Sequence, residues 1–354
     1  MSKRKVFVFG SNGSAIISAL FHQSEGADVT LFDPGVHFDR ENPKFFAPEI
    51  AFWPSSEVNF ENLGWVEKLV NLELGGIEKD LPPIGFENNE PTPFIGFGEK
   101  KYTSLPAAAS WNLRARLVVN DPSEKVYNRA LELFEGTIKQ YSEISKVNLN
   151  GDGIESVEIN GGKELKADHY VFAQSPLELL ELFPEEAISA RVRTRIARTQ
   201  HYSRVSLALD LPESFESEFS QNLMFLLPNQ NDQQPAMGLM GPGISVWQSF
   251  LPGEQAEDPE ALATLIRNMK KLIGKSIPTL TDFIGAAGIH VQREAYAEYN
   301  RDEAWDDFKK HNNNASLVSP IWSSQHGLAA CVEACQAAAE SSCREASNLL
   351  ETSP

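Results

Sequence analysis

The sequence predicts an α/β protein with a parallel sheet, and three patterns near its amino end carry this prediction. Residues 6–9 and 29–32 are short runs of apolar, β-branched and aromatic side chains, which are typical of buried parallel strands. Between them, residues 14–24 place apolar side chains at helical spacing. A strand, a glycine-containing turn, a helix and a second strand within about 30 residues form a βαβ unit.

The remainder of the chain mixes strand and helix patterns, so we expect an α+β region beside the parallel sheet. Residues 36–121 are rich in proline, phenylalanine and glycine, and we interpret them as irregular structure. An amphipathic helix is predicted over residues 126–141, and Asn-Gly turns predict a β-meander over residues 144–172. Further strands are predicted at residues 204–209, 223–227, 245–250 and 290–299, and helices at residues 259–273, with Asp258 as N-cap, and 327–350.

The composition disfavours nucleic acids and membranes as partners, so we expect a small-molecule substrate. Among 354 residues, 31 are basic and 49 are acidic, and the net charge of −18 repels nucleic-acid phosphates and anionic membranes. No stretch approaches about 18 uninterrupted apolar residues, so we expect a soluble protein. The three cysteines are too few for a disulfide framework and indicate a reducing, cytoplasmic location. The seven histidines show no metal-ligand spacing, and the sequence leaves the oligomeric state open.

The turn after the first predicted strand has the spacing of a dinucleotide-binding loop, whose glycines permit a tight turn and close approach to a pyrophosphate. Against the pattern G-x-G-x-x-G, the chain offers Gly10, Asn12 and Ala15. Asp33 follows Gly10 by 23 residues, where an acidic side chain would bind a ribose hydroxyl. The helix amino end adds free N–H groups and a positive dipole. The predicted cofactor-binding residues of this unit are Gly10, Ser11, Asn12, Gly13, Ser14, Ala15 and Asp33.

In three blocks, the chain resembles the flavin-dependent amine oxidase and protoporphyrinogen oxidase group of FAD proteins. The first block is the βαβ unit. The second spans residues 144–176 and contains a hairpin followed by a segment from Ala167-Asp168 to Pro176. The third begins with Gly327-Leu328 and is similar to the closing helix of that family, whose amino end faces the flavin. The order and spacing of the three blocks agree over nearly the whole chain.

This resemblance implies a glutathione-reductase-like Rossmann FAD domain with an inserted α+β substrate domain. The discontinuous dinucleotide-binding domain would comprise residues 1–40, 110–180 and 310–354. The substrate-side domain would comprise residues 41–109 and 181–309.

The resemblance also implies site residues outside the turn. The backbone of Ile144 would pair with the adenine of FAD, and Gly327 and Leu328 would lie at the flavin. The candidates for lining the substrate pocket precede the closing helix, and they are Trp322, Gln325 and His326.

The chain departs from the family at three cofactor contacts. Asn12 replaces the second glycine, and Pro34-Gly35 stands where the family has a Gly-Gly-Arg segment. Ser319-Pro320 replaces the Gly-Asp pair before the closing helix. These departures leave two interpretations open: FAD is held in a modified way, or the fold has been reused.

The function that the resemblance implies is an FAD-dependent, amine-oxidase-like oxidoreductase acting on a small organic substrate. No general base is assigned, because the flavin itself accepts the hydride. The alternative is a catalytically silent relative that binds a ligand or a protein partner without flavin. A third interpretation, an NAD(P)-dependent enzyme, is disfavoured because the closing helix resembles that of flavin proteins.

Overall fold

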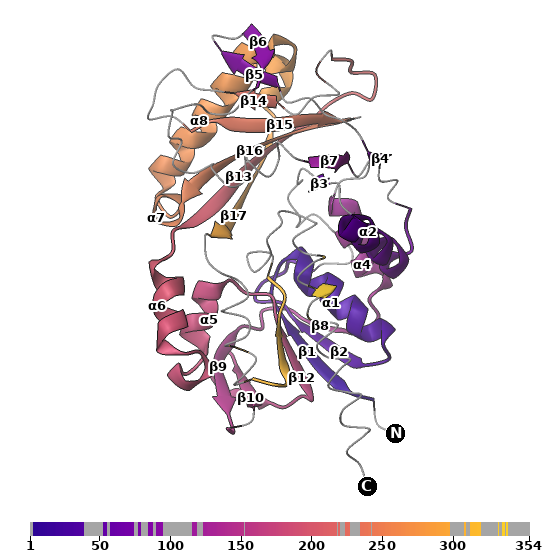
Figure 1. Cartoon of the computed structure of the whole chain (residues 1–354), viewed down its shortest axis with the longest axis vertical. Coiled ribbons are helices and arrows are strands. Elements are labelled where there is room, and N and C mark those ends of the chain that lie inside the picture. Colours follow the sequence, from indigo (N-terminus) through magenta and orange to yellow (C-terminus); the bar gives the residue numbers. More distant parts are fainter. Residues whose placement is uncertain are drawn as a thin grey trace.

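The computed structural model shows two main sheets in different halves of the molecule (Figure 1). Between residues 172 and 201, the chain passes from one half to the other through helices α5 (Pro176–Leu182) and α6 (Ala190–Arg198). The structure describes residues 3–38, 52–54, 57–73, 77–78, 84–87, 90–94, 115–118, 123–151, 153–217, 219, 224–226, 234–241, 243–297, 308, 312–319, 332, 335–336 and 338.

The first sheet is parallel and joins strands that lie far apart in the sequence. Its order is β18-β12-β1-β2-β8, and all four neighbouring pairs are parallel. Helix α1 (Gly13–Ser24) connects β1 to β2. The strands are β1 (Lys5–Phe9), β2 (Asp28–Phe32), β8 (Thr137–Lys139), β12 (His169–Phe172) and β18 (Ala315–Leu317). The predicted βαβ unit is therefore confirmed.

The alternation of side chains in β1 gives the sheet two different cores. Val6 and Val8 join an apolar cluster with α1 and with α4 (Ser123–Leu133). Phe7 and Phe9 point to the opposite face, where the Phe9 ring stacks on Phe32 with a centroid distance of 4.9 Å. Burial on both faces explains why this strand is apolar throughout.

The prediction of one helix over residues 126–141 is wrong in its second half. Helix α4 ends at Leu133, and residues 137–139 form the edge strand β8. A Cβ atom on Gly136 would lie 2.6 Å from the carbonyl oxygen of Val29, so the glycine permits a close approach to β2. Ile138 pairs with Leu31 of β2, and its apolar side chain suits either a helix or a strand.

The interpretation of residues 36–121 as irregular structure is wrong within the described part. Residues Glu57–Val70 form helix α2, and its buried residues Val66 and Val70 join the apolar core beside α1. Gly64 interrupts the helical pattern of the sequence, so the pattern does not predict this helix. A small antiparallel sheet of order β3-β7-β4 consists of β3 (Phe52–Pro54), β7 (Ala115–Val118) and β4 (Ile77–Glu78).

The predicted β-meander is confirmed for its first two strands, β9 (Ile144–Leu149) and β10 (Ile154–Ile159). The third predicted strand divides into β11 (Lys163–Leu165), which completes this antiparallel sheet, and β12, which joins the parallel one. Asp168 marks the division, because its Oδ2 accepts a hydrogen bond of 2.7 Å from the backbone N–H of Lys5. Its own N–H donates to the carbonyl of Lys5 at 2.9 Å.

The second main sheet has the order β17-β13-β16-β15-β14-β5-β6. The predicted strands at 204–209, 223–227, 245–250 and 290–299 correspond to β13, β14, β16 and β17, whereas β5, β6 and β15 were not predicted. The strands are β5 (Ile84–Glu87), β6 (Glu90–Pro93), β13 (His201–Asp210), β14 (Met224–Leu226), β15 (Ala236–Gly241), β16 (Ile244–Pro252) and β17 (Gly288–Ala297).

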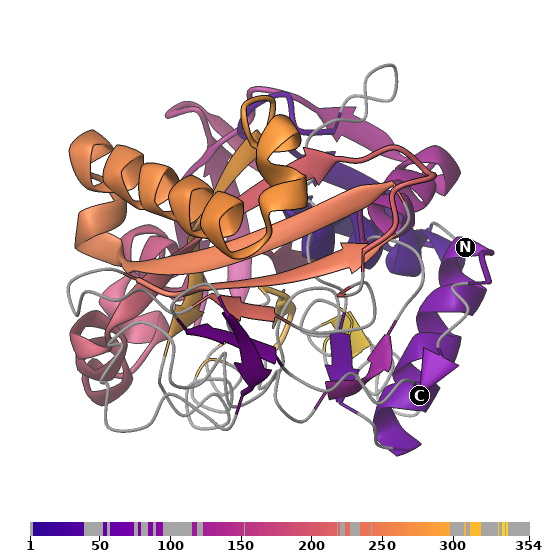
Figure 2. The ribbon, with the colours of Figure 1, turned by 90° about the horizontal axis from the view of Figure 1, so that it is seen from above.

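Helix α8 (Pro259–Ser276) covers one face of this sheet. The helix predicted over residues 259–273 is therefore confirmed. Asp258 caps it, with Oδ1 accepting a hydrogen bond of 2.9 Å from Glu260 N–H. Viewed from above, α8 (orange) lies over the sheet, and β1 and α1 (indigo) lie beneath it (Figure 2). The remaining short helices are η1 (Glu185–Ala187), α7 (Gly253–Ala256), η2 (Pro278–Leu280) and α9 (Thr281–Ile284).

The prediction of an α/β fold with a parallel sheet is confirmed. The parallel sheet gathers segments from the amino end, the middle and the carboxyl end of the chain. The residue bounds of the two predicted domains stay a prediction.

Candidate functional site

The turn between β1 and α1 depends on Gly10. Its φ is +143°, which side chains rarely permit, and a Cβ there would lie 2.8 Å from the Cβ of Ala173. Its N–H donates a 3.2 Å hydrogen bond to the carbonyl of Phe32. The first predicted glycine therefore lies at the carboxyl-terminal edge of the sheet, between the ends of β2 and β12.

Asn12 stands where a dinucleotide-binding loop has its second glycine, and its side chain is used within the protein. Its Oδ1 accepts a hydrogen bond of 3.2 Å from Ala15 N–H, which caps α1. Its Nδ2 donates to the carbonyl of Ala173 at 2.7 Å. Asn12 therefore ties the amino end of α1 to the end of β12, and together with Ser11 it stays partly exposed.

Three buried residues complete the predicted turn. A Cβ on Gly13 would lie 2.3 Å from ring atoms of Tyr127, so α4 packs against bare backbone here. The hydroxyl of Ser14 is buried and has no hydrogen-bond partner, while its carbonyl accepts from Cys335 Sγ at 3.5 Å. Ala15 is fully buried in the core beside α1.

The contact between Gly13 and Tyr127 allows a direct test of this packing. Gly13→Ala should destabilise the protein by about 1–3 kcal/mol, because the new methyl group overlaps the tyrosine ring. In a Tyr127→Leu background the same substitution should cost little, since the overlapping ring is gone. Urea unfolding of the two single variants and the double variant measures the coupling. Additive effects would contradict the contact.

Asp33 lies at the end of β2 as predicted, but the chain itself satisfies its carboxylate. The side chain is 0% exposed. Oδ1 accepts hydrogen bonds from Gly35 N–H at 2.9 Å and from the His37 ring Nδ1 at 2.7 Å. Oδ2 accepts from the N–H groups of His37 at 2.6 Å and Phe38 at 3.0 Å. A carboxylate offers about four acceptor positions, so these four donors use all of them.

Ile144 follows a segment that is hydrogen-bonded to Asp33 and to the loop after it. The preceding Ser142 donates from its backbone N–H to the carbonyl of Asp33 at 2.8 Å, and Tyr141 N–H donates to Gly35 at 3.0 Å. Ile144 itself begins β9 and is buried. The turn, Asp33 and the segment before Ile144 therefore share one edge of the parallel sheet.

The other predicted site residues lie outside the described residues, and they are Trp322, Gln325, His326, Gly327 and Leu328. Within the predicted closing helix, residues 332, 335–336 and 338 are described and helical. Val332, Cys335 and Ala338 are buried in the same core as Ala15. The described part of this segment therefore packs against the amino end of α1.

Sequence reasoning missed two residues that shape the site, Tyr127 and His37. Tyr127 follows Val126, which the helical pattern marked as buried, but no sequence pattern shows that the ring meets Gly13. His37 follows Asp33 by four residues, and an acidic residue that closes a strand often accepts hydrogen bonds from the following turn. This spacing could have predicted the contact between the two residues. Ala173 belonged to the second block of the resemblance without a predicted role.

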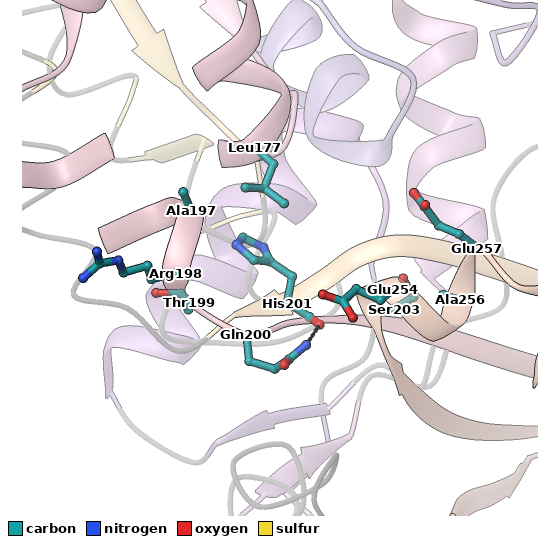
Figure 3. A pocket seen from close by; sticks show the side chains of 11 residues that line it. Leu177, Ala197, Arg198, Thr199, Gln200, His201, Ser203, Glu254, Ala256 and Glu257 are labelled. Atoms are coloured by element: carbon teal, nitrogen blue, oxygen red, sulfur yellow. Dashed lines mark hydrogen bonds between the residues drawn. The ribbon is translucent and has the colours of Figure 1, made fainter. Parts of the chain in front are cut away.

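A separate pocket of about 330 Å³ lies where α6, β13 and α7 meet (Figure 3). Arg198 lies on one side of it, and Glu254 and Glu257 lie on the other. His201 Nε2 lies 3.2 Å from the carbonyl of Ile196 and donates to it, since a carbonyl can only accept. Burial lowers the pKa of His201, and the hydrogen bond to Ile196, which by itself raises the pKa, offsets only part of this effect. None of the predicted site residues lines this pocket.

Two features are absent from the described part of the chain. No helix there combines the length and the apolar character that a membrane span requires. No group of three metal-ligating side chains comes together among those same residues.

Comparison of the sequence with models of protein families gives no match, and comparison with curated proteins gives none either. Solved structures share the fold. One is a protein from Exiguobacterium sp. 255-15 assigned provisionally as a protoporphyrinogen oxidase, with a TM-score of 0.61 and 9% identity over 96% of this chain and 99% of that chain.

Two oxygenases have similar folds. One is the tetrameric form of 2-methyl-3-hydroxypyridine-5-carboxylic acid oxygenase, with a TM-score of 0.54 and 16% identity over 95% of this chain and 80% of that chain. The other is PqsL from Pseudomonas aeruginosa, which is considered an FAD-dependent monooxygenase, with a TM-score of 0.54 and 16% identity over 96% and 86%. The expected Rossmann-type fold is therefore confirmed.

The polar groups of the turn fit the pyrophosphate of FAD, the cofactor that the resemblance of the sequence implies. The buried Ser14 hydroxyl has no partner, whereas the spaces that a side chain would take at Gly10 and Gly13 are filled by Ala173 and Tyr127. Asn12 uses one of its two amide hydrogens on Ala173, which leaves the second for an acceptor. The positive end of α1 favours an anion at this place.

Asp33 does not fit the role of a ribose ligand as it lies here. A ribose hydroxyl could bind its carboxylate only by displacing one of the four donors that already surround it. The turn and Asp33 therefore have different roles: the turn suits a dinucleotide, whereas the Asp33 carboxylate stabilises its own loop.

Proposed function

We propose that the protein is an FAD-dependent oxidoreductase that acts on a small organic substrate. The observation that carries this proposal is the glycine turn at the carboxyl-terminal edge of the parallel sheet, where α/β proteins of this kind bind their ligands. The similarity of fold to flavoproteins over nearly the whole chain supports it.

The turn would hold the cofactor through its pyrophosphate. Asn12 would donate its second amide hydrogen, and the first N–H groups of α1 would lie beside it. From the resemblance of the sequence, Ile144 would lie at the adenine, and Trp322, Gln325 and His326 would line the substrate pocket. When bound, FAD supplies the hydride-accepting chemistry, so the protein needs mainly to orient the substrate. An amine is the first substrate to test, because the sequence resembles the amine oxidase group.

Asn12→Asp is the sharpest test of this proposal. Aspartate has the shape of asparagine and still caps α1, but it loses the amide donor and adds a negative charge at the pyrophosphate. Affinity for FAD should fall by about 10- to 150-fold, which corresponds to a charge-assisted hydrogen bond of about 1.5–3 kcal/mol. Titration of FAD, FMN and NAD(P)H, followed by flavin or tryptophan fluorescence, measures the change. Asp258→Asn, at the exposed cap of α8, is the matched control and should leave FAD binding unchanged.

A second candidate is a relative that keeps the fold and binds a ligand or protein partner without flavin. The internal hydrogen bonds of Asn12 and the fully satisfied carboxylate of Asp33 favour it. The same titration separates the two candidates. Saturable FAD binding that Asn12→Asp weakens supports the enzyme, and absence of binding by the unmodified protein supports the flavin-free relative.

A further inference from the structure

The second main sheet has two unlike faces. Val205 and Leu207 of β13 and Trp247 of β16 point towards α8 and form an apolar core with it. Because successive side chains of a strand alternate between faces, the residues between them point to the other side of the sheet. This other face is turned towards the half that carries β1 and α1 (Figure 2).

That second face carries buried polar side chains. Arg204, Ser206 and Gln248 are 6%, 1% and 4% exposed. Ser206 lies directly opposite Gln248 in the pairing of β13 with β16. Cross-strand neighbours of this kind place their Cβ atoms about 5 Å apart, so Ser206 and Gln248 are neighbours on this face. Arg204 lies two residues before Ser206 on the same face, and its Nη2 donates to Oε1 of Gln292.

Two of these side chains lack the hydrogen bonds that buried polar groups normally make. Ser206 Oγ and Gln248 Nε2 are buried and have no partner. Such groups destabilise a folded protein, and two of them side by side on a buried sheet face point to a ligand that supplies the missing partners. The Gln248 amide nitrogen can only donate and the Ser206 hydroxyl can donate, so the ligand must offer acceptor oxygens.

We propose that Ser206, Gln248 and Arg204 bind the carboxylate of a small organic acid, which is the substrate of the oxidoreductase function proposed above. Two donors from adjacent strands match the two oxygens of a carboxylate, and the Arg204 guanidinium provides the compensating positive charge. The inference rests on the proposed function only in naming the acid as a substrate. The binding site itself stands on the sheet geometry.

Acetate and benzoate, compared with the neutral acetamide and benzamide, test the site by thermal shift and calorimetry. The acids should raise the melting temperature of the unmodified protein, and the amides should not. In Ser206→Ala and Gln248→Leu the response to the acids should be lost. Both variants should melt about 2–4 °C higher without ligand, because each removes a buried polar group that lacks a partner. If Ser206 and Gln248 had a merely structural role, both variants would melt at a lower temperature than the unmodified protein.

Ser249→Ala is the matched control. Ser249 neighbours Gln248 on β16 but points to the opposite face, where its hydroxyl donates to the carbonyl of Pro235 at 2.8 Å. This variant should be less stable and should keep the full response to the acids. An equal response to acids and amides would overturn the proposal, as would no response, or a response that survives in both Ser206→Ala and Gln248→Leu.

The failure of this site and the failure of the proposed function give different results. An anion response without any FAD binding leaves the carboxylate site standing and removes the oxidoreductase. FAD binding without an anion response removes the carboxylate site and leaves the proposed oxidoreductase function standing.

Discussion

Asp33→Ala is expected to destabilise the protein by about 3–5 kcal/mol, the range found when one partner of a buried charged network is removed. The substitution deletes a carboxylate that is 0% exposed and accepts four hydrogen bonds. It leaves the backbone N–H groups of Gly35, His37 and Phe38 without this acceptor, and the loss costs most at Phe38, which is buried. Urea unfolding of both proteins measures the difference.

A matched control uses the exposed aspartate Asp258, which accepts one hydrogen bond from Glu260 N–H at the start of α8. Asp258→Ala should cost only about 1 kcal/mol, the usual value of a helix cap. A stability loss for Asp33→Ala no larger than this control, together with weakened FAD binding, would contradict the structural role and restore Asp33 as a ribose ligand. The comparison therefore decides which function the carboxylate has.

Acid is expected to destabilise the protein by about 3 kcal/mol through His22 alone as the pH falls from 6.5 to 4. His22 of α1 and His169 of β12 are both buried, and their ring centroids lie 5.6 Å apart. Burial, with the charge of Arg4 as a smaller cause, lowers the pKa of His22 to about 4. Burial is also the main cause that lowers the pKa of His169, followed by His22 and Arg4.

The direction of this effect follows from where the proton binds. The unfolded chain binds a proton to His22 below the ordinary pKa of 6.5, whereas the folded chain does so only near 4. Between these values the unfolded state holds more protons, so lowering the pH favours unfolding, and well above 6.5, where both states have lost the proton, the contribution is constant.

Urea unfolding at a series of pH values tests this behaviour with His22→Leu. The His22 Nε2 atom has no hydrogen-bond partner, so leucine removes the titrating group without breaking a bond at that atom. The variant should lose less stability than the unmodified protein as the pH falls from 6.5 to 4. Parallel profiles for the two proteins would show that His22 does not titrate in this range.

The roles of the site residues depend more on their hydrogen-bond partners than on their residue types. The sequence identified Asp33 by its distance from Gly10, and the structure places it at the end of β2 as expected. Its four donors come from the loop that follows, whose conformation has no sequence period. Asn12 behaves similarly, because its amide reaches Ala173, which lies 161 residues later in the chain.

The sequence by itself determined the βαβ unit, the hairpin of β9 and β10, and helix α8 with its Asp258 cap. These elements depend on contacts between near neighbours, so periodicity and turn chemistry are sufficient to predict them. Only the tertiary structure decided that residues 137–139 form a strand beside β2, and that β12 leaves the hairpin sheet to join β1. A short apolar segment can satisfy its backbone in a helix or in a sheet, and the choice depends on which strand lies next to it. That neighbour comes from a distant part of the chain, so no local pattern records it.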